Sequence, residues 1–247
     1  MSLPEWQALT TEHSDTTGPV WYWLSGWSFA PGVFEALVHQ LPGQHLALNW
    51  HAASGSFDAF ASRLAATAEP DAIWIGWSLG GALAMRAAVT AKARTVVTLA
   101  TGQRFCKPAP DSNWGMAADV FAAFQDGLQQ QPEKTLKRFL GLCAQGSNER
   151  KALMQALASH QLNPAELDLA HSLAWLGDYD LGTDQQALTA AGIPQQHLYA
   201  SADSLSPGGL TPATTLGHSH ALLLESATTP QLLALLQTLS GQDVTPS

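Results

Sequence analysis

The sequence contains little charge and few cysteines. Asp, Glu, Lys and Arg make up 13% of the 247 residues, against roughly 25% in an average soluble domain. The formal net charge is −9, and a chain with this balance is not expected to bind nucleic acid or an anionic membrane. Cys106 and Cys143 are too few for a disulfide framework and have no partner at metal-ligand spacing.

Long hydrophobic runs are also missing. No stretch of the sequence reaches the length that a membrane-spanning helix requires. The first residues, MSLPEWQALTTEHSDTTG, have neither the basic start nor the apolar run of a secretory signal. We therefore expect a cytoplasmic protein, and a chain of 247 residues is long enough for one α/β domain with a single core.

Basic residues are distributed unevenly. Seven of the eleven Lys and Arg residues lie between Arg104 and Lys151, and none follows Lys151. Within residues 134–151, five positive charges accompany one negative charge, Glu149. This segment predicts either a local basic patch that attracts an acidic partner or an ordinary solvated helix face.

Short apolar runs bounded by turn residues predict strands that are covered on both faces. These runs lie at residues 20–24, 45–50, 72–77, 95–100 and 196–201. Apolar side chains near helical spacing predict helices between the first four runs, at residues 31–41, 56–70 and 80–93. Strands that alternate with helices predict a parallel α/β sheet with right-handed crossovers.

The alternation stops after Thr101. Amphipathic patterns then predict consecutive helices at residues 113–130, 132–146, 148–161 and 163–178. We interpret residues 108–180 as a helical lid inserted into a single domain, residues 1–247, whose core comprises about 18–107 and 181–242. The alternative is a set of helices that only pack.

Ser78 lies in the sequence Gly-Trp-Ser-Leu-Gly-Gly, between the apolar run 72–77 and a helical pattern. A strand, a tight turn and a helix in this order are typical of a nucleophile elbow, which holds a reactive serine at the end of a strand. Gly76 and Gly80 would avoid collisions across the turn, and Gly81 would let the helix approach the sheet.

Two backbone amides are candidates for binding an oxyanion. The amide of Leu79 follows the serine at the start of the predicted helix, so it would face a reacting carbonyl. The loop WLSGWSF, residues 23–29, follows the first strong strand, and we assign the second amide to Trp27. Trp27 could equally be a residue that only packs.

A serine nucleophile needs a histidine base and a carboxylate. In folds that carry a nucleophile elbow, these residues follow in the order Ser, acid, His. Asp203 comes directly after the run 196–201, where catalytic groups collect at strand ends. His218 and His220 both precede an apolar run, and spacing does not separate them. The alternative acids, which read more easily as helix-end or turn residues, are Asp178, Asp180 and Asp184.

These motifs together resemble the α/β-hydrolase family. GWSLGG, SGWS, LYASADSLSP and SHALLLES are similar to its elbow, oxyanion loop, acid and base segments. The helices in MAADVFAAFQDGLQQQPEKTLKRFLGLCAQGS look like the lid of one group in it, the biotin-pathway esterases that act on pimeloyl-acyl-carrier-protein methyl ester. The resemblance spans about residues 20–240.

The resemblance implies a triad of Ser78, Asp203 and His220, and so favours His220 over His218. It also implies a substrate pocket formed by Trp27, Leu79 and the segment Phe139, Leu140, Gly141, Leu142 and Cys143. Two features differ from the group. Ser25 stands where many relatives have histidine, and only sixteen residues, rich in Pro, Gly and Thr, separate the acid from the base, so we expect no helix there.

The function implied is hydrolysis of the methyl ester of pimeloyl-acyl-carrier protein through an acyl-enzyme, by a monomer that needs no metal or cofactor. Acyl carrier proteins are acidic, so the basic cluster would dock one, with contacts at Lys134, Arg138, Arg150 and Lys151. Three alternatives use the same scaffold. They are a broad short-chain carboxylesterase, a lyase-like or synthase-like relative that abstracts a proton, and a non-catalytic acyl-binding protein.

Overall fold

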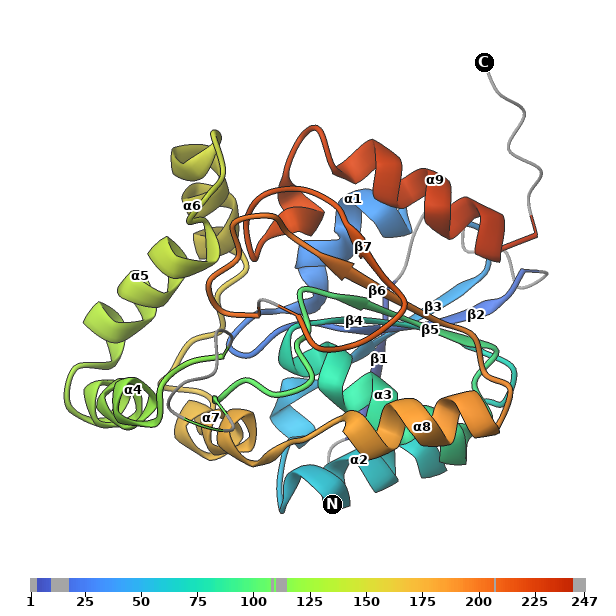
Figure 1. Ribbon diagram of the computed structural model, residues 1–247, viewed down its shortest axis with the longest axis horizontal. Helices are drawn as coiled ribbons and strands as arrows, with labels where there is room; N and C mark the ends of the chain where they lie inside the picture. Colours follow the sequence, from blue (N-terminus) through green and yellow to red (C-terminus); the bar gives the residue numbers. More distant parts are fainter. Residues whose placement is uncertain (1–3, 10–17, 108, 110–114, 207, 242–247) are drawn as a thin grey trace.

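The computed structural model describes residues 4–9, 18–107, 109, 115–206 and 208–241. Its centre is a seven-stranded sheet in the order β1-β3-β2-β4-β5-β6-β7 (Figure 1). The strands are β1 (Trp6–Ala8), β2 (Val20–Leu24), β3 (Gln44–Leu48), β4 (Ile73–Trp77), β5 (Thr95–Leu99), β6 (Gln195–Tyr199) and β7 (Ala213–Thr215). Only β1 runs antiparallel to its neighbour, so the predicted parallel α/β sheet is confirmed.

The two edge strands were not predicted from the sequence. β1 and β7 have three residues each, which is too short to give a periodic hydrophobic signal. β7 lies in the interval between Asp203 and His220, where the structure has an edge strand and no helix among the described residues, as the composition predicted.

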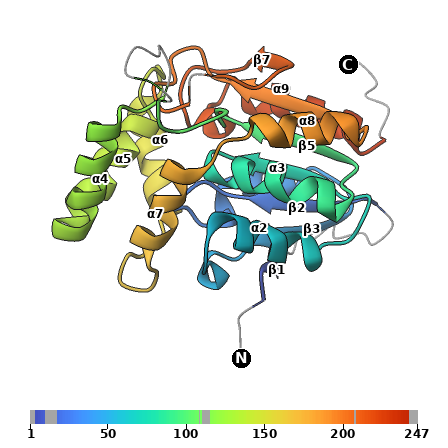
Figure 2. The same ribbon diagram turned by 60° about the horizontal axis from the view of Figure 1, so that its bottom comes forward.

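Helices cover both faces of the sheet (Figures 1 and 2). α1 (Glu35–Val38) and α9 (Thr229–Leu239) lie on one face, and α2 (Phe57–Ala66), α3 (Leu79–Ala91) and α8 (Gly182–Ala190) lie on the other. The segment 31–41, predicted as one helix, begins instead with a 3-10 turn, Pro31–Phe34, which leads into α1. No element was predicted for the segment that forms α8.

Four helices gather at one end of the molecule (Figures 1 and 2). They are α4 (Ala118–Gln130), α5 (Pro132–Cys143), α6 (Arg150–Ser159) and α7 (Leu169–Asp178), so the four predicted helices of the insertion are confirmed. α4 packs against α5 and α7, and α6 packs against α5. The predicted start of the insertion, residue 108, and the predicted end of the core, residue 242, lie outside the described residues.

The core lies between the sheet and its helices, and it holds the strand that leads to Ser78. All five residues of β4 are buried, because β2 and β5 flank it and helices cover it. Ten residues of α3 are buried, mostly small ones, which lets this helix lie close to the sheet. None of the described helices is both long and apolar enough to cross a membrane.

Candidate active site

Ser78 occupies a strained turn at the end of β4. Its φ of 56° and ψ of −123° place a non-glycine residue in a region that L-amino acids rarely adopt. Two hydrogen bonds stabilise this strained conformation: the backbone N–H of Ser78 donates to Leu99 O at 2.9 Å, and its carbonyl accepts from Thr101 Oγ1 at 3.0 Å. The side chain is 6% exposed. This is the geometry that the sequence predicted for Ser78.

The glycines around Ser78 permit close backbone approaches. A Cβ atom on Gly76 would lie 2.4 Å from the Cα of Gly81, so strand and helix meet where neither has a side chain. A Cβ atom on Gly80 would lie 2.1 Å from Leu24 O, at the end of the neighbouring strand. The turn is therefore restricted to glycine at these positions.

His220 and Asp203 form a buried pair. His220 Nδ1 lies 2.8 Å from Asp203 Oδ2, and the side chains are 1% and 0% exposed. The other carboxylate oxygen of Asp203 accepts from the backbone N–H groups of Leu205 at 2.8 Å and Ser206 at 3.2 Å. The carboxylate is thus fixed, and it holds the imidazole with its Nε2 edge available for proton transfer.

The alternative acids and base lie elsewhere. His218 is exposed, and its Nδ1 lies 2.9 Å from Ser201 Oγ. Asp180 accepts from Gln103 and Gly182 and pairs with Arg104, while Asp184 accepts from Arg86 Nε at 2.6 Å. Asp178 is exposed at the end of α7. The structure therefore brings His220, and none of these four residues, to Asp203.

His220 is also hydrogen-bonded to the strand that leads to Ser78. Trp77, immediately before Ser78, donates from Nε1 to His220 O at 2.8 Å, and the two rings lie 5.7 Å apart. Within the described part of the chain, no hydrogen bond joins Ser78 to His220. Catalytic hydrogen bonds are often long in a protein without substrate and tighten when it binds.

The predicted oxyanion loop lies against Ser78. A Cβ atom on Gly26 would lie 3.3 Å from Ser78 Cβ, which places the loop after β2 beside the serine. Ser25 holds this loop internally: its Oγ donates to Phe29 O at 2.7 Å and accepts from Trp50 Nε1 at 3.0 Å. Leu79 is the first residue of α3, so its N–H has no partner within that helix.

Aromatic side chains connect this loop to the inserted helices. Trp27 meets Phe124 of α4 and Phe139 of α5 edge-on, with ring centroids 5.5 Å and 5.2 Å apart. Its Nε1 donates to Leu169 O, at the start of α7, at 2.9 Å. Phe29 continues the contact from Phe139 to Trp77. An aromatic wall therefore runs from the inserted helices to the turn that carries Ser78.

The five predicted pocket residues of α5 lie on different faces of that helix. Phe139 belongs to the aromatic wall, and Leu142 lines a cavity of about 470 Å³ between α4 and α5. Cys143 is buried, and its carbonyl accepts from the backbone N–H of Ala221, next to His220, at 3.1 Å. Leu140 lines a separate groove against α6, and Gly141 O accepts from Arg150.

Burial raises the pKa of the Cys143 thiol well above its ordinary value, and the nearby negative charge of Asp203 adds to this effect. A thiol with a raised pKa remains protonated and is a weak nucleophile. Cys143 is therefore a poor alternative to Ser78 as a nucleophile. Among the described residues, no group of three or more His, Cys, Asp or Glu side chains could hold a metal ion.

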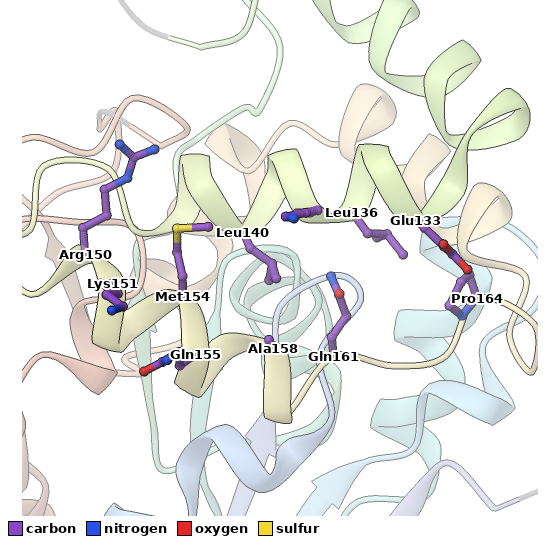
Figure 3. Close-up of a pocket in the computed structure, with 11 residues that line it drawn as sticks. Glu133, Leu136, Leu140, Arg150, Lys151, Met154, Gln155, Ala158, Gln161 and Pro164 are labelled. Carbon is purple, nitrogen blue, oxygen red and sulfur yellow. The ribbon is translucent and has the colours of Figure 1, made fainter.

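The basic residues gather on α5 and α6 beside the site. Lys134, Arg138, Arg150 and Lys151 are all exposed, and no ion pair within the described residues includes them. Lys134, Arg138 and Arg150 line one hollow of about 400 Å³. A larger groove of about 980 Å³ lies between the two helices, with Leu140 of α5 and Met154 of α6 along it (Figure 3).

Three residues that contact the segment of His220 or the oxyanion loop were given no role from the sequence. Trp77 and Glu225 hold the segment around His220, and Phe124 packs on Trp27. Trp77 carries no signal beyond its apolar character, whereas Phe124 belongs to the segment that resembles the lid of the esterase group. Glu225 also carries a signal, because a carboxylate that follows HALLL is a charge in an apolar run, which is rare without hydrogen-bond partners.

A strained serine between a central parallel strand and a helix, with a buried Asp–His pair that follows it in the chain, is the arrangement of an α/β hydrolase. The chain belongs to this family: the alpha/beta hydrolase family model matches residues 15–234. The family membership predicted from the motifs is confirmed.

Two relatives define the group within the family. The pimeloyl-[acyl-carrier protein] methyl ester esterase of Xylella fastidiosa (strain 9a5c) is 34% identical over 248 residues, covering 89% of this chain and 94% of the relative. The enzyme of the same name from Klebsiella pneumoniae subsp. pneumoniae is 32% identical over 202 residues, covering 76% and 77%. An esterase from Exiguobacterium antarcticum has the same fold, with a TM-score of 0.72 and 14% identity over 96% of this chain and 95% of its own.

Proposed function

We propose that this protein is a serine carboxylesterase that hydrolyses the methyl ester of pimeloyl-acyl-carrier protein and so frees the pimeloyl carboxylate for biotin synthesis. The observation that carries the proposal is the buried contact of 2.8 Å between His220 Nδ1 and Asp203 Oδ2, next to the strained turn of Ser78. The names of the relatives support the choice of substrate.

The reaction proceeds in two halves. Ser78 Oγ attacks the ester carbonyl, and His220 accepts the serine proton and passes it to the departing methoxide, which leaves as methanol. Water then attacks the acyl-enzyme, with His220 again accepting a proton and returning it to Ser78. Asp203 keeps the Nδ1 proton in place and stabilises the imidazolium that forms in each half.

Charge that develops on the carbonyl oxygen is held by backbone amides. The N–H of Leu79 lies at the start of α3, where the helix dipole favours negative charge. The N–H of Trp27 lies in the loop that Gly26 brings against Ser78. No metal or organic cofactor takes part in these steps.

The inserted helices α4 to α7 act as a lid over the acyl chain. Trp27 and Phe139 line the path of the substrate, and the cavity of about 470 Å³ between α4 and α5, which Phe139 and Leu142 line, extends it. An apolar wall suits the methylene chain of a pimeloyl group. The ester then reaches Ser78 while the carrier remains outside.

The carrier protein docks on α5 and α6. Acyl carrier proteins are acidic, and Lys134, Arg138, Arg150 and Lys151 place four exposed positive charges on this face of an acidic protein. A local field of this kind raises the rate of encounter and orients the partner. We assign the reaction to a monomer in the cytoplasm.

The first test compares hydrolysis of the carrier-bound methyl ester with that of p-nitrophenyl butyrate. A triple reversal of Lys134, Arg138 and Lys151 to Glu should raise KM for the carrier-bound ester at least tenfold and leave the small ester unchanged. Lys92→Glu, at the amino ends of the strands, is the matched control and should affect neither substrate.

Equal losses on both substrates would contradict carrier docking on α5 and α6. Cleavage of only the small ester by the wild type would identify a broad short-chain carboxylesterase. If neither ester is cleaved, the scaffold serves binding without catalysis, and the proposed function is wrong.

A further inference from the structure

Glu225 is a buried carboxylate that binds the turn before His220. It is 3% exposed and lies five residues after the histidine. Oε1 accepts from the backbone N–H of Ser219 at 2.7 Å and from Ser219 Oγ at 2.6 Å, and Oε2 accepts from the backbone N–H of His218 at 2.9 Å. Three donors from two consecutive residues therefore converge on one carboxylate.

The turn is shaped around this carboxylate. Gly217 has a φ of 81°, and a Cβ atom there would lie 2.9 Å from Glu225 Oε2 and 2.8 Å from Thr228 Oγ1. Glu225 is itself held at the entry to α9, because its carbonyl accepts from the backbone N–H groups of Thr228 and Thr229, both at 3.0 Å. The Glu225 carboxylate is thus held in place by the start of α9, and it fixes the conformation of the turn by accepting its hydrogen bonds.

Other elements hold His220 and Ala221, the two residues that follow the turn bound by Glu225. Trp77 donates to His220 O at 2.8 Å, and the N–H of Ala221 donates to Cys143 O at 3.1 Å. Asp203 holds the ring. Each of these contacts fixes His220 or the residue after it. Of the two residues before it, His218 is held by Glu225 and also by Ala202, whose N–H donates to His218 O at 2.9 Å, while Glu225 binds both the N–H and the Oγ of Ser219.

We propose that Glu225 is a positioning residue for His220: it fixes the backbone that precedes the base and thereby aligns the imidazole between Asp203 and Ser78. This inference rests on the proposed function for its catalytic meaning. The carboxylate contacts neither substrate nor the reacting atoms. It acts through hydrogen bonds to His218 and Ser219, and its charge is balanced by N–H and O–H groups without a described cation.

Glu225→Gln tests this role with little change in shape. An amide has one acceptor oxygen and one NH₂ group, so at least one of the three donors must face the NH₂ group and the turn must shift. We expect kcat to fall on the order of a hundredfold, as for a small misalignment of a catalytic group, with KM nearly unchanged. In the pH profile of kcat/KM, the acidic limb, where activity falls at low pH, should move to lower pH. Both a weaker contact with Asp203 and the lost negative charge of Glu225 disfavour the imidazolium form of His220.

Proton NMR of histidine-labelled protein tests the alignment without any substrate. In the wild type, the His220 Nδ1 proton, held by Asp203, should give a downfield signal, and Glu225→Gln should shift or broaden it. Asp184→Asn is the matched control, since it also removes a buried carboxylate, one that pairs with Arg86 between α3 and α8. It should lower stability and leave the signal and the acidic limb unchanged.

Ser219→Ala is a milder second variant that removes only the hydroxyl donor to Oε1, so it should fold even if Glu225→Gln does not. We expect the same changes in kcat and in the NMR signal, with an effect on kcat of a few-fold to tenfold. A folded Glu225→Gln or Ser219→Ala protein with the wild-type signal and acidic limb would overturn the proposal. The NMR signal is measured without an ester. It therefore still tests whether Glu225 aligns His220 if the proposed esterase activity is not found.

Discussion

Trp77 and His220 lie 143 positions apart in the chain, yet the indole Nε1 of Trp77 donates to the backbone carbonyl of His220 at 2.8 Å. Trp77 is the last residue of β4 and directly precedes Ser78. The strand that leads to Ser78, the proposed nucleophile, therefore also holds the backbone of His220, the proposed base. Ser78 and His220 are thus supported by the same strand, which favours a reproducible distance between them.

Trp77→Phe should lower kcat about tenfold, because the phenyl ring keeps most of the packing and loses the donor to His220 O. Steady-state kinetics on the small ester measures this, with KM expected to stay within about twofold. Trp21→Phe is the matched control, since Trp21 Nε1 donates to Pro42 O at the same distance of 2.8 Å. Trp21 lies near the amino end of β2, whereas Trp77 and Ser78 lie at the carboxyl end of β4. Equal kcat values for the two variants would contradict a role for Trp77.

Removal of the triad side chains should abolish nearly all turnover. Ser78→Ala and His220→Ala should each lower kcat by on the order of a thousandfold or more. His218→Ala should stay within a few-fold of the wild type, because His218 is exposed and contacts Ser201. A large loss for His218→Ala beside a mild one for His220→Ala would reverse the assignment of the base.

Asp203→Asn should lower kcat by up to about ten thousandfold, because an amide favours the wrong imidazole tautomer. Asp180→Asn removes a competing carboxylate that pairs with Arg104 and not with a histidine. It should retain activity on the small ester. If Asp180→Asn is the inactive variant, the acid has been misassigned.

Gly80→Ala should fold poorly, because its Cβ atom would lie 2.1 Å from Leu24 O, and neither backbone can move without disturbing β2 or the serine turn. We expect a loss of about 1 to 3 kcal/mol in the free energy of unfolding. Gly141→Ala is the contrast: its nearest neighbour would be Arg150 Nη2 at 3.4 Å, within a helix. In a urea titration, the free energy of unfolding of Gly141→Ala should rise by up to about 1 kcal/mol.

His197 should make the fold sensitive to acid. Its side chain is 1% exposed, its Nδ1 lies 2.8 Å from Thr98 Oγ1, and burial lowers its pKa from 6.5 to about 4. The folded protein therefore keeps the neutral form while the unfolded chain takes up a proton below pH 6.5. The stability that His197 contributes is present above pH 6.5 and is lost as the pH falls toward 4.

Urea unfolding at pH 7.5 and pH 4.5 measures this dependence. The drop in the free energy of unfolding between the two should be about 2 to 3 kcal/mol smaller for His197→Gln than for the wild type. His51→Gln, at an exposed histidine, should leave the drop unchanged. An identical drop in His197→Gln and wild type would show that this histidine does not couple folding to protons.

Local patterns were enough to predict much of the fold. The runs 20–24 and 95–100 correspond to β2 and β5 within one residue, because strands covered on both faces are apolar throughout. Helices α4 to α7 were predicted from spacing alone. The sequence missed β1, β7 and α8, since three-residue edge strands and a largely polar helix give no such signal.

By itself, the sequence determined the strand–turn–helix around Ser78, because the glycines and the apolar run that make this turn are neighbours in the chain. It also narrowed the acid to Asp203 and three alternatives, and the base to His218 or His220. Spacing left His218 and His220 open, and the resemblance to the family favoured His220. The tertiary structure showed the contact of His220 with Asp203, and it alone brought Trp77 and Glu225 to the segment that carries His220. These contacts join residues that pack together only when the sheet forms. Spacing along a chain carries no information about which of two histidines, one residue apart, turns inward.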